Sequence, residues 1–77
     1  MRFEYLCIPE TAVLQDGTRM PTYAVLCVRR TRRHTATVCR FSDVSMDYAF
    51  TNHLCCLCTQ EQVEPCHFLD VLYDLTP

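Results

Sequence analysis

The spacing of apolar residues changes once along this chain, and that change constrains the fold more than any other feature. Before Phe41, apolar residues alternate with polar ones or form short runs rich in β-branched side chains, as strands do. From Ser45 they recur every three or four residues, as on the buried side of a helix. A chain of 77 residues has room for one hydrophobic core. The pattern predicts a single domain over residues 1–77, with strands first and helices after.

Three strands are predicted in the first part. In Arg2–Ile8 the residues alternate in character, and Pro9 is expected to end the strand. Asp16-Gly17 is typical of a tight turn, because Gly accepts a positive φ angle. Thr22–Arg30 is apolar on both of its alternating sides, which favours a central position in the sheet. Thr35–Phe41 is the third strand, so the sheet is a meander.

Two helices are predicted in the second part. The first begins at Ser45 as the N-cap, with Asp47 in its first turn. The second begins near Pro65 and runs to about Leu75. The expected apolar stripe of the first helix consists of Met46, Ala49, Phe50, His53, Leu54, Leu57 and Cys58. In the second helix, Pro65, Phe68, Val71, Leu72 and Leu75 lie on one side, with Leu69 at its edge. The resulting fold class is α+β: a three-stranded antiparallel meander followed by two helices packed on one face (β-β-β-α-α), with Met46, Phe50, Leu54, Phe68 and Leu72 in the core.

The charge of the chain is divided as sharply as its periodicity. Residues 1–40 carry seven arginines against three carboxylates, a net charge of +4, whereas residues 41–77 carry six carboxylates and no Lys or Arg, a net charge of −6. The overall charge of −2 hides this division. A chain polarised in this way is more informative about its partners than about chemistry.

Five arginines are predicted to gather near one turn of the sheet. Four of them surround the turn between the second and third strands, and Arg40 returns on the third strand: the set is Arg29, Arg30, Arg32, Arg33 and Arg40. Guanidinium groups bind phosphate or carboxylate through paired hydrogen bonds. An acidic protein surface and a nucleic acid are both open as partners, as are neutralisation by the acidic helices and a merely solvated turn.

A second group of polar residues lies on the outer side of the second helix: His67, Asp70 and Asp74 follow one another at positions i, i+3 and i+7. They could present a charged face to a partner, or be an ordinary solvated helix face. Neither a nucleophile elbow nor a Gly-rich phosphate loop accompanies them, so no enzymatic activity is expected.

The seven cysteines predict mostly buried thiols. An odd number that includes the adjacent pair Cys55-Cys56 fits poorly with a secreted disulfide framework, and the apolar runs are too short for a signal peptide or a membrane span. A reducing cytoplasm is therefore expected. No cofactor is expected, but a structural zinc ion bound by Cys55, Cys58, Cys66 and His67 remains an alternative, because Cys55-x-x-Cys58 has the spacing of a zinc ligand pair.

Several segments resemble a family of short uncharacterised bacterial proteins of unknown function. They are Thr22-Tyr23-Ala24-Val25, Asp43-Val44-Ser45, Leu57-Cys58 and Val63-x-Pro65-x-His67-Phe68-x-Asp70-Val71-x-x-Asp74. The chain departs from the pattern at Glu64, where a Ser-type cap is usual, and at Tyr73, where an acid is usual. The resemblance implies a cytoplasmic bacterial protein whose family has no established activity.

The sequence thus favours a small, non-catalytic binding or regulatory protein that docks on a larger protein or protein–nucleic-acid complex, for instance as an inhibitor. The docking residues would be the arginine set, the acidic helix face, or both. A nucleic-acid-binding module and a zinc-stabilised domain are the alternatives. No membrane partner is expected, and opposite charges on one small body leave a homodimer open.

Overall fold

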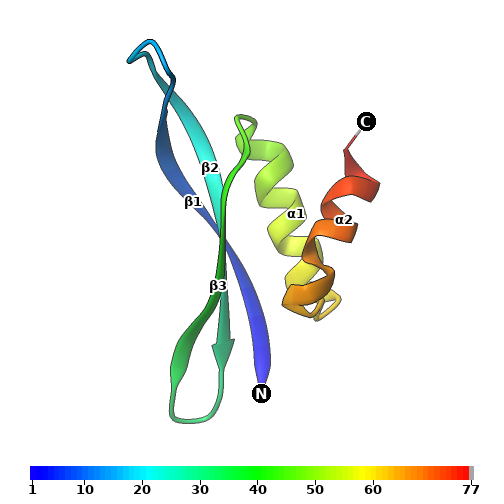
Figure 1. Cartoon of the computed structure of the whole chain (residues 1–77). Helices are drawn as coiled ribbons and strands as arrows, with labels where there is room; N and C mark the ends of the chain where they lie inside the picture. Colours follow the sequence, from blue (N-terminus) through cyan, green and yellow to red (C-terminus); the bar gives the residue numbers. More distant parts are fainter. Residues whose placement is uncertain (77) are drawn as a thin grey trace.

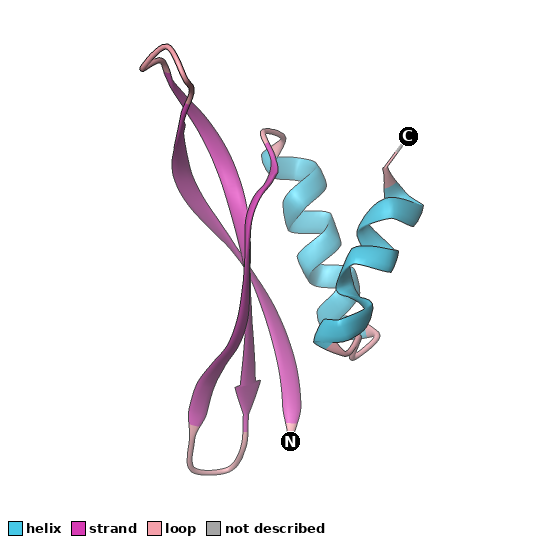
Figure 2. Cartoon of the chain, in the orientation of Figure 1, coloured by secondary structure: helices cyan, strands magenta, loops and turns pink. Residues whose placement is uncertain are grey.

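Three strands and two helices make up residues 1–76, the part of the chain that the computed structural model describes (Figure 1). In chain order they are β1 (Arg2–Val13), β2 (Arg19–Arg30), β3 (Thr35–Ser45), α1 (Tyr48–Gln60), a 3₁₀ turn η1 (Pro65–His67) and α2 (Phe68–Leu75). The strands form one antiparallel sheet in the order β1-β2-β3, and both helices lie on the same face of that sheet (Figures 1 and 2). The predicted α+β meander with two helices on one face is confirmed.

The strands are longer than their sequence pattern predicts, and Pro9 does not end β1. Pairing between β1 and β2 runs from Arg2 opposite Arg30 to Val13 opposite Arg19, and Gly17 closes the turn with a φ of 85°. The amide N–H groups of Phe3 and Tyr5 donate away from β2, to the side chains of Gln62, just after α1, and Thr59, in its last turn. Pro9 has the same parity as these residues, so its missing N–H faces the outer edge of the sheet and removes no bond to β2.

A bulge separates the two halves of β3. Val25 pairs with Phe41 and Tyr23 with Ser45, so that only Ala24 stands opposite residues 42–44. Asp43 adopts a positive φ of 53° there, a conformation that Asp tolerates better than most residues. Its carboxylate accepts a hydrogen bond of 2.8 Å from the buried Thr22 hydroxyl, which fixes the bulge to the central strand.

Helix α1 begins later than predicted and buries a different face. Asp47, not Ser45, is the N-cap: its carboxylate accepts the Phe50 N–H at 3.1 Å, while the Ser45 hydroxyl accepts the Asp47 N–H. The buried residues of α1 are Thr51, Leu54, Cys55 and Cys58. Met46, Ala49 and His53 are exposed, so their assignment to the apolar stripe was wrong.

The shift of the buried face has a local cause. The Thr51 hydroxyl donates to the Asp47 carbonyl at 2.9 Å, so this polar residue enters the core with its hydrogen bond satisfied. Cysteine packs as a small apolar side chain, so Cys55 can serve as a core residue even though the hydropathy pattern placed it outside.

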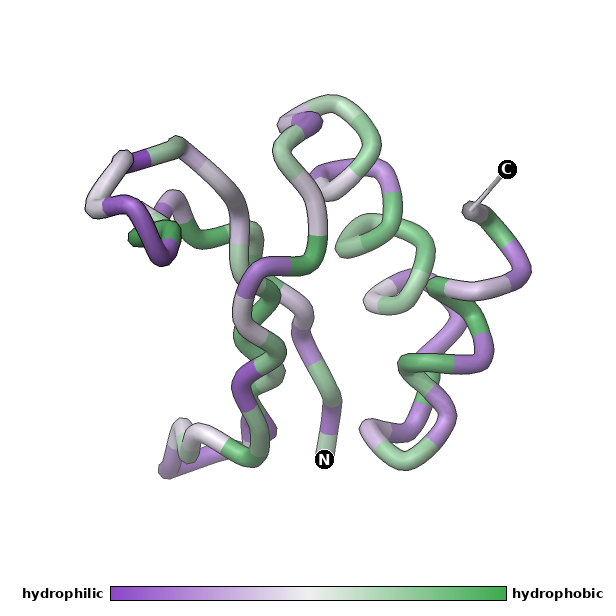
Figure 3. Tube along the Cα trace, turned by 45° about the horizontal axis from the view of Figure 1, so that its top comes forward, coloured by the Kyte–Doolittle hydropathy of each residue, from purple (hydrophilic) through white to green (hydrophobic). Residues whose placement is uncertain are grey.

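Phe68 is the centre of the core. Its side chain is fully buried, and its ring stacks on Phe41 of β3 and Tyr5 of β1, with centroid distances of 4.2 and 5.6 Å. The predicted apolar side of the second helix is confirmed, because Val71, Leu72 and Leu75 pack against the same cluster. Figure 3 shows apolar segments where the strands pass the helices, and hydrophilic ones around the β2–β3 turn.

Side chains after α1 and at its end cover part of the edge of β1. Gln62 accepts a hydrogen bond from the Phe3 N–H at 3.0 Å and donates one to the Phe3 carbonyl at 2.9 Å. Thr59 accepts the Tyr5 N–H at 2.9 Å, and the Tyr5 hydroxyl donates to the Val63 carbonyl at 2.6 Å. These contacts protect the strand edge and fix the position of the helices along the sheet.

Candidate docking surface

Five of the seven arginines lie at one end of the sheet, where β1 begins and β2 turns into β3. Arg2 stands opposite Arg30 in the register, next to the β2–β3 turn that carries the other members. We call this surface the basic end; it consists of Arg2, Arg29, Arg30, Arg32 and Arg33. With Glu4 as the neighbouring carboxylate, five arginines leave a net charge of +4 on it. Figure 1 shows the turn projecting below the helices, at the opposite end of the sheet from the β1–β2 turn.

Only one arginine of the basic end has a carboxylate partner within residues 1–76. Arg30 forms an ion pair with Glu4, and both side chains are partly exposed. Arg2, Arg29, Arg32 and Arg33 form no ion pair with any described carboxylate. Concentrating uncompensated guanidinium groups is unfavourable in isolation, so this surface is suited to binding an anion.

Arg40 lies elsewhere. It stands opposite Leu26 of β2 in the register. Its Nη2 atom lies 2.7 Å from Glu10 Oε2 of β1, so this ion pair spans the central strand, on the face of the sheet away from the helices. Glu10 Oε1 also accepts the Asp43 N–H at 2.7 Å. These two contacts lower the pKa of Glu10, the Arg40 hydrogen bond more than the Asp43 one. Arg40 therefore has a structural contact across the sheet and is separate from the basic end.

A shallow groove adjoins the basic end. It lies between β1 and the last turns of α1, has a volume of about 550 Å³, and is lined by Arg2, Glu4, Tyr5, Cys56, Thr59 and Gln60. Arg2 belongs to both the groove and the basic end. A protruding acidic segment of a partner could therefore contact charge and a concave surface together.

The second predicted surface, the acidic face of α2, is also exposed. It consists of His67, Asp70 and Asp74, on the side of the helix away from Phe68. His67 Nδ1 lies 3.7 Å from Asp70 Oδ2. Among the described residues no ion pair joins this face to an arginine of the sheet, so neutralisation of the arginine set by the helices is not observed.

All seven thiols are free, and five of them lie in or against the core: Cys7, Cys27, Cys39, Cys55 and Cys58. Burial raises the pKa of Cys55 to about 12 and that of Cys58 to about 11. Such thiols remain protonated at neutral pH and are poor nucleophiles. They behave as small apolar side chains, as the sequence predicted.

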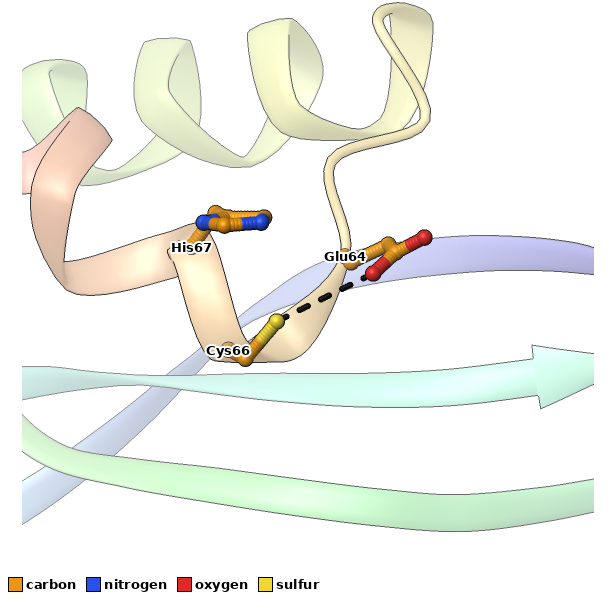
Figure 4. Close-up of side chains that lie close together, drawn as sticks. All are labelled: Glu64, Cys66 and His67. Carbon is orange, nitrogen blue, oxygen red and sulfur yellow. Dashed lines mark hydrogen bonds between the residues drawn. The ribbon is translucent and has the colours of Figure 1, made fainter.

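The structure does not assemble the predicted zinc ligands as one set. Cys55 and Cys58 are buried, whereas Cys66 and His67 are exposed. Within the described residues, the metal-ligating side chains that lie within 4.8 Å of one another are Glu64, Cys66 and His67 (Figure 4). Glu64 was noted in the sequence only as a departure from a capping residue.

Sequence reasoning also missed the carboxylates that organise the sheet surface. Glu4 lies inside the alternating segment Arg2–Ile8, and Glu10 follows it by two residues. Nothing in the sequence around either carboxylate identifies the arginine with which it pairs. A correct register for β1 against β2 would have placed Glu4 diagonally across from Arg30. The pairing of Glu10 with Arg40 also depends on the bulge in β3.

Comparison of the chain with protein-family models, curated proteins and solved structures found no match. Within residues 1–76, no helix has the length and apolar content needed to cross a bilayer.

Proposed function

We propose that this protein is a small, non-catalytic binding protein whose basic end docks on an acidic surface of a larger protein. One observation carries the proposal: Arg2, Arg29, Arg32 and Arg33 gather at one end of the sheet without a carboxylate partner among residues 1–76. The neighbouring groove gives the partner a concave surface to contact beside these charges. The proposal includes three further points. The protein would inhibit its partner, it would act in a bacterial cytoplasm, and it could self-associate through the opposite charges of sheet and helices.

An acidic protein is favoured over a nucleic acid for two reasons. No aromatic side chain is interleaved with the arginines of the β2–β3 turn, so the turn offers no platform on which bases could stack. Residues 41–77 add a net charge of −6 to the same small body, which would repel a long polyanion. A compact acidic patch needs to approach only the basic end.

The test compares three forms of the purified protein as bait in the cytoplasm of the source cell. Arg29→Gln/Arg32→Gln/Arg33→Gln removes three positive charges from the basic end. Gln15→Glu/Arg19→Glu removes the same net charge at the β1–β2 turn, at the other end of the sheet. We expect the wild type and the second variant to recover the same acidic partner, and the first variant to lose it.

Binding to the recovered partner is then measured with purified components. The association rate should fall steeply with salt for the wild type, and less steeply for the basic-end variant, because electrostatic steering acts on encounter. Equal recovery by both variants contradicts the proposal and favours the acidic face, which Asp70→Asn/Asp74→Asn then tests. Salt-sensitive binding of a fluorescent oligonucleotide at about 50 mM salt, lost in the basic-end variant, would instead favour the nucleic-acid alternative.

A further inference from the structure

The turn that precedes α2 brings three different metal-ligating side chains together. Glu64, Cys66 and His67 each place one ligand atom within 4.8 Å of the other two, and all three are exposed. Figure 4 shows the Cys66 sulfur facing the Glu64 carboxylate, with the His67 ring above the turn and directed toward Glu64. A carboxylate, a thiol and an imidazole meeting at one point form a donor set of a kind that ordinary solvated faces lack.

The spacing suits a tetrahedral ion. With metal–sulfur and metal–oxygen bonds of about 2.3 and 2.0 Å, two tetrahedral ligand atoms are about 3.5 Å apart. The Cys66 Sγ and Glu64 Oε2 atoms are 3.8 Å apart. A shift of a few tenths of an ångström in exposed side chains would bring them to the bonding separation.

The backbone beneath these side chains is held in place. Pro65 restricts the preceding Glu64 to an extended conformation, and the His67 N–H donates to the Glu64 carbonyl at 2.9 Å. Val63, on one side of the turn, is bonded to Cys58 and Tyr5, and Phe68, on the other side, is the buried centre of the core. The backbone that carries the ligands therefore needs little ordering before a metal binds.

The electrostatic surroundings favour a cation. Among residues 1–76 no arginine forms an ion pair with Glu64, and Asp70 Oδ2 lies 3.7 Å from His67 Nδ1. A carboxylate next to a ligating imidazole is the usual second layer of a zinc site, where it orients the ring. Two anionic ligands and one neutral imidazole would balance the charge of a divalent ion.

We propose that Glu64, Cys66 and His67 form a solvent-open site for Zn²⁺, with water in the fourth position. Thiolate and imidazole ligands select Zn²⁺ over the hard cations Mg²⁺ and Ca²⁺, which prefer oxygen. The site shares Cys66 and His67 with the zinc set predicted from the sequence, but Glu64 is the third protein ligand and Cys55 and Cys58 take no part. It is also independent of docking through the basic end.

Cobalt(II) is the probe, since it occupies zinc sites and reports thiolate ligation through a charge-transfer absorption band. The reduced wild-type protein should bind one equivalent of Co²⁺ with this band, and Zn²⁺ should displace it. Cys66→Ser should abolish the band, and Glu64→Gln and His67→Gln should each weaken Co²⁺ binding at least about tenfold. Cys56→Ser is the matched control, because Cys56 is also exposed but lies on α1 outside the cluster.

All four substituted residues are exposed, so the variants should unfold at the same denaturant concentration as the wild type in the absence of metal. The proposal is overturned if the wild type gives no thiolate band, or if the band survives in Cys66→Ser. It is also overturned if Cys56→Ser removes the band, which would assign the metal to another thiol.

Discussion

Glu10 is the residue at which charge and sheet geometry are most closely linked. Its carboxylate receives Arg40 and the backbone of Asp43, and both contacts lower its pKa in the folded state. The stabilisation from these contacts is therefore complete above the pKa of the unfolded chain, near 4.5, and is lost as the pH falls through the lower folded value. We expect Glu10→Gln to be less stable than the wild type at neutral pH.

The difference in unfolding midpoint between wild type and Glu10→Gln should be largest above pH 4.5 and shrink in more acidic solution. Urea titrations at several pH values measure it. Glu61→Gln, a change at an exposed residue just after α1, should show little difference at any pH. A constant difference for Glu10→Gln across the acid range would contradict a role for the ionised carboxylate.

Phe68 is the residue whose loss should affect stability most. Its ring fills the space between Tyr5 and Phe41, so Phe68→Ala leaves a cavity in the only aromatic stack of the described core. We expect a loss of about 3–5 kcal/mol, a large fraction of the stability of a domain of this size. Chemical denaturation checks it against Leu69→Ala, whose side chain is 45% exposed and should cost less than about 1 kcal/mol.

Residue types alone predicted some of this core but not all of it. Phe68 and Leu54 follow a strong helical period and were identified correctly, whereas Met46 and His53 satisfy the same period and are exposed. The error arises because Thr51 is polar and because Cys55 lies off the stripe that the three- and four-residue spacing selects. Their burial depends on a hydrogen bond and on the packing of thiols, which become visible only once the helix is placed on the sheet.

At the scale of elements, the stability of the fold also depends on the contact between Gln62 and the edge of β1. Gln62 bonds both backbone groups of Phe3, which would otherwise face solvent at an unpaired edge. Gln62→Ala should cost about 1–2 kcal/mol, because two hydrogen bonds to the backbone are lost.

Hydrogen exchange measures this effect at the strand edge. The amide of Phe3 should exchange faster in Gln62→Ala, while Gln60→Ala, an exposed neighbour, should leave the rate unchanged. Equal rates in all three proteins would show that the strand edge is protected by other means.

The elements also show where sequence patterns stop being informative. Type and order were correct for all three strands and both helices. The ends of β1 and β3 were not, because Pro9 is harmless at an outer edge and the bulge at Asp43 extends β3 by changing its register. Both causes depend on neighbouring strands. The same is true of the surface: the β2–β3 turn was predicted, but the separation of Arg40 from it follows from pairing with Glu10.

At the scale of the whole molecule, six of the seven thiols fall into two classes. Cys56 and Cys66 are exposed, whereas Cys7, Cys27, Cys55 and Cys58 are shielded and burial raises the pKa of each. In the native protein, Cys56 and Cys66 should be alkylated first, and the shielded thiols should react at comparable rates only in denaturant. Mass spectrometry of timed iodoacetamide reactions identifies each site; rapid native labelling of Cys55 or Cys58 would contradict the described core.

The β1–β2 turn is a suitable site for attaching a tag or a fluorophore to this protein. Leu14–Thr18 is exposed, is closed by its own backbone hydrogen bonds, and leaves open space around Gly17. It lies at the far end of the sheet from the basic end and away from the turn before α2 (Figure 1). An affinity tag or fluorophore inserted between Gln15 and Asp16 would therefore hold the protein on a sensor surface with both proposed binding surfaces directed into solution.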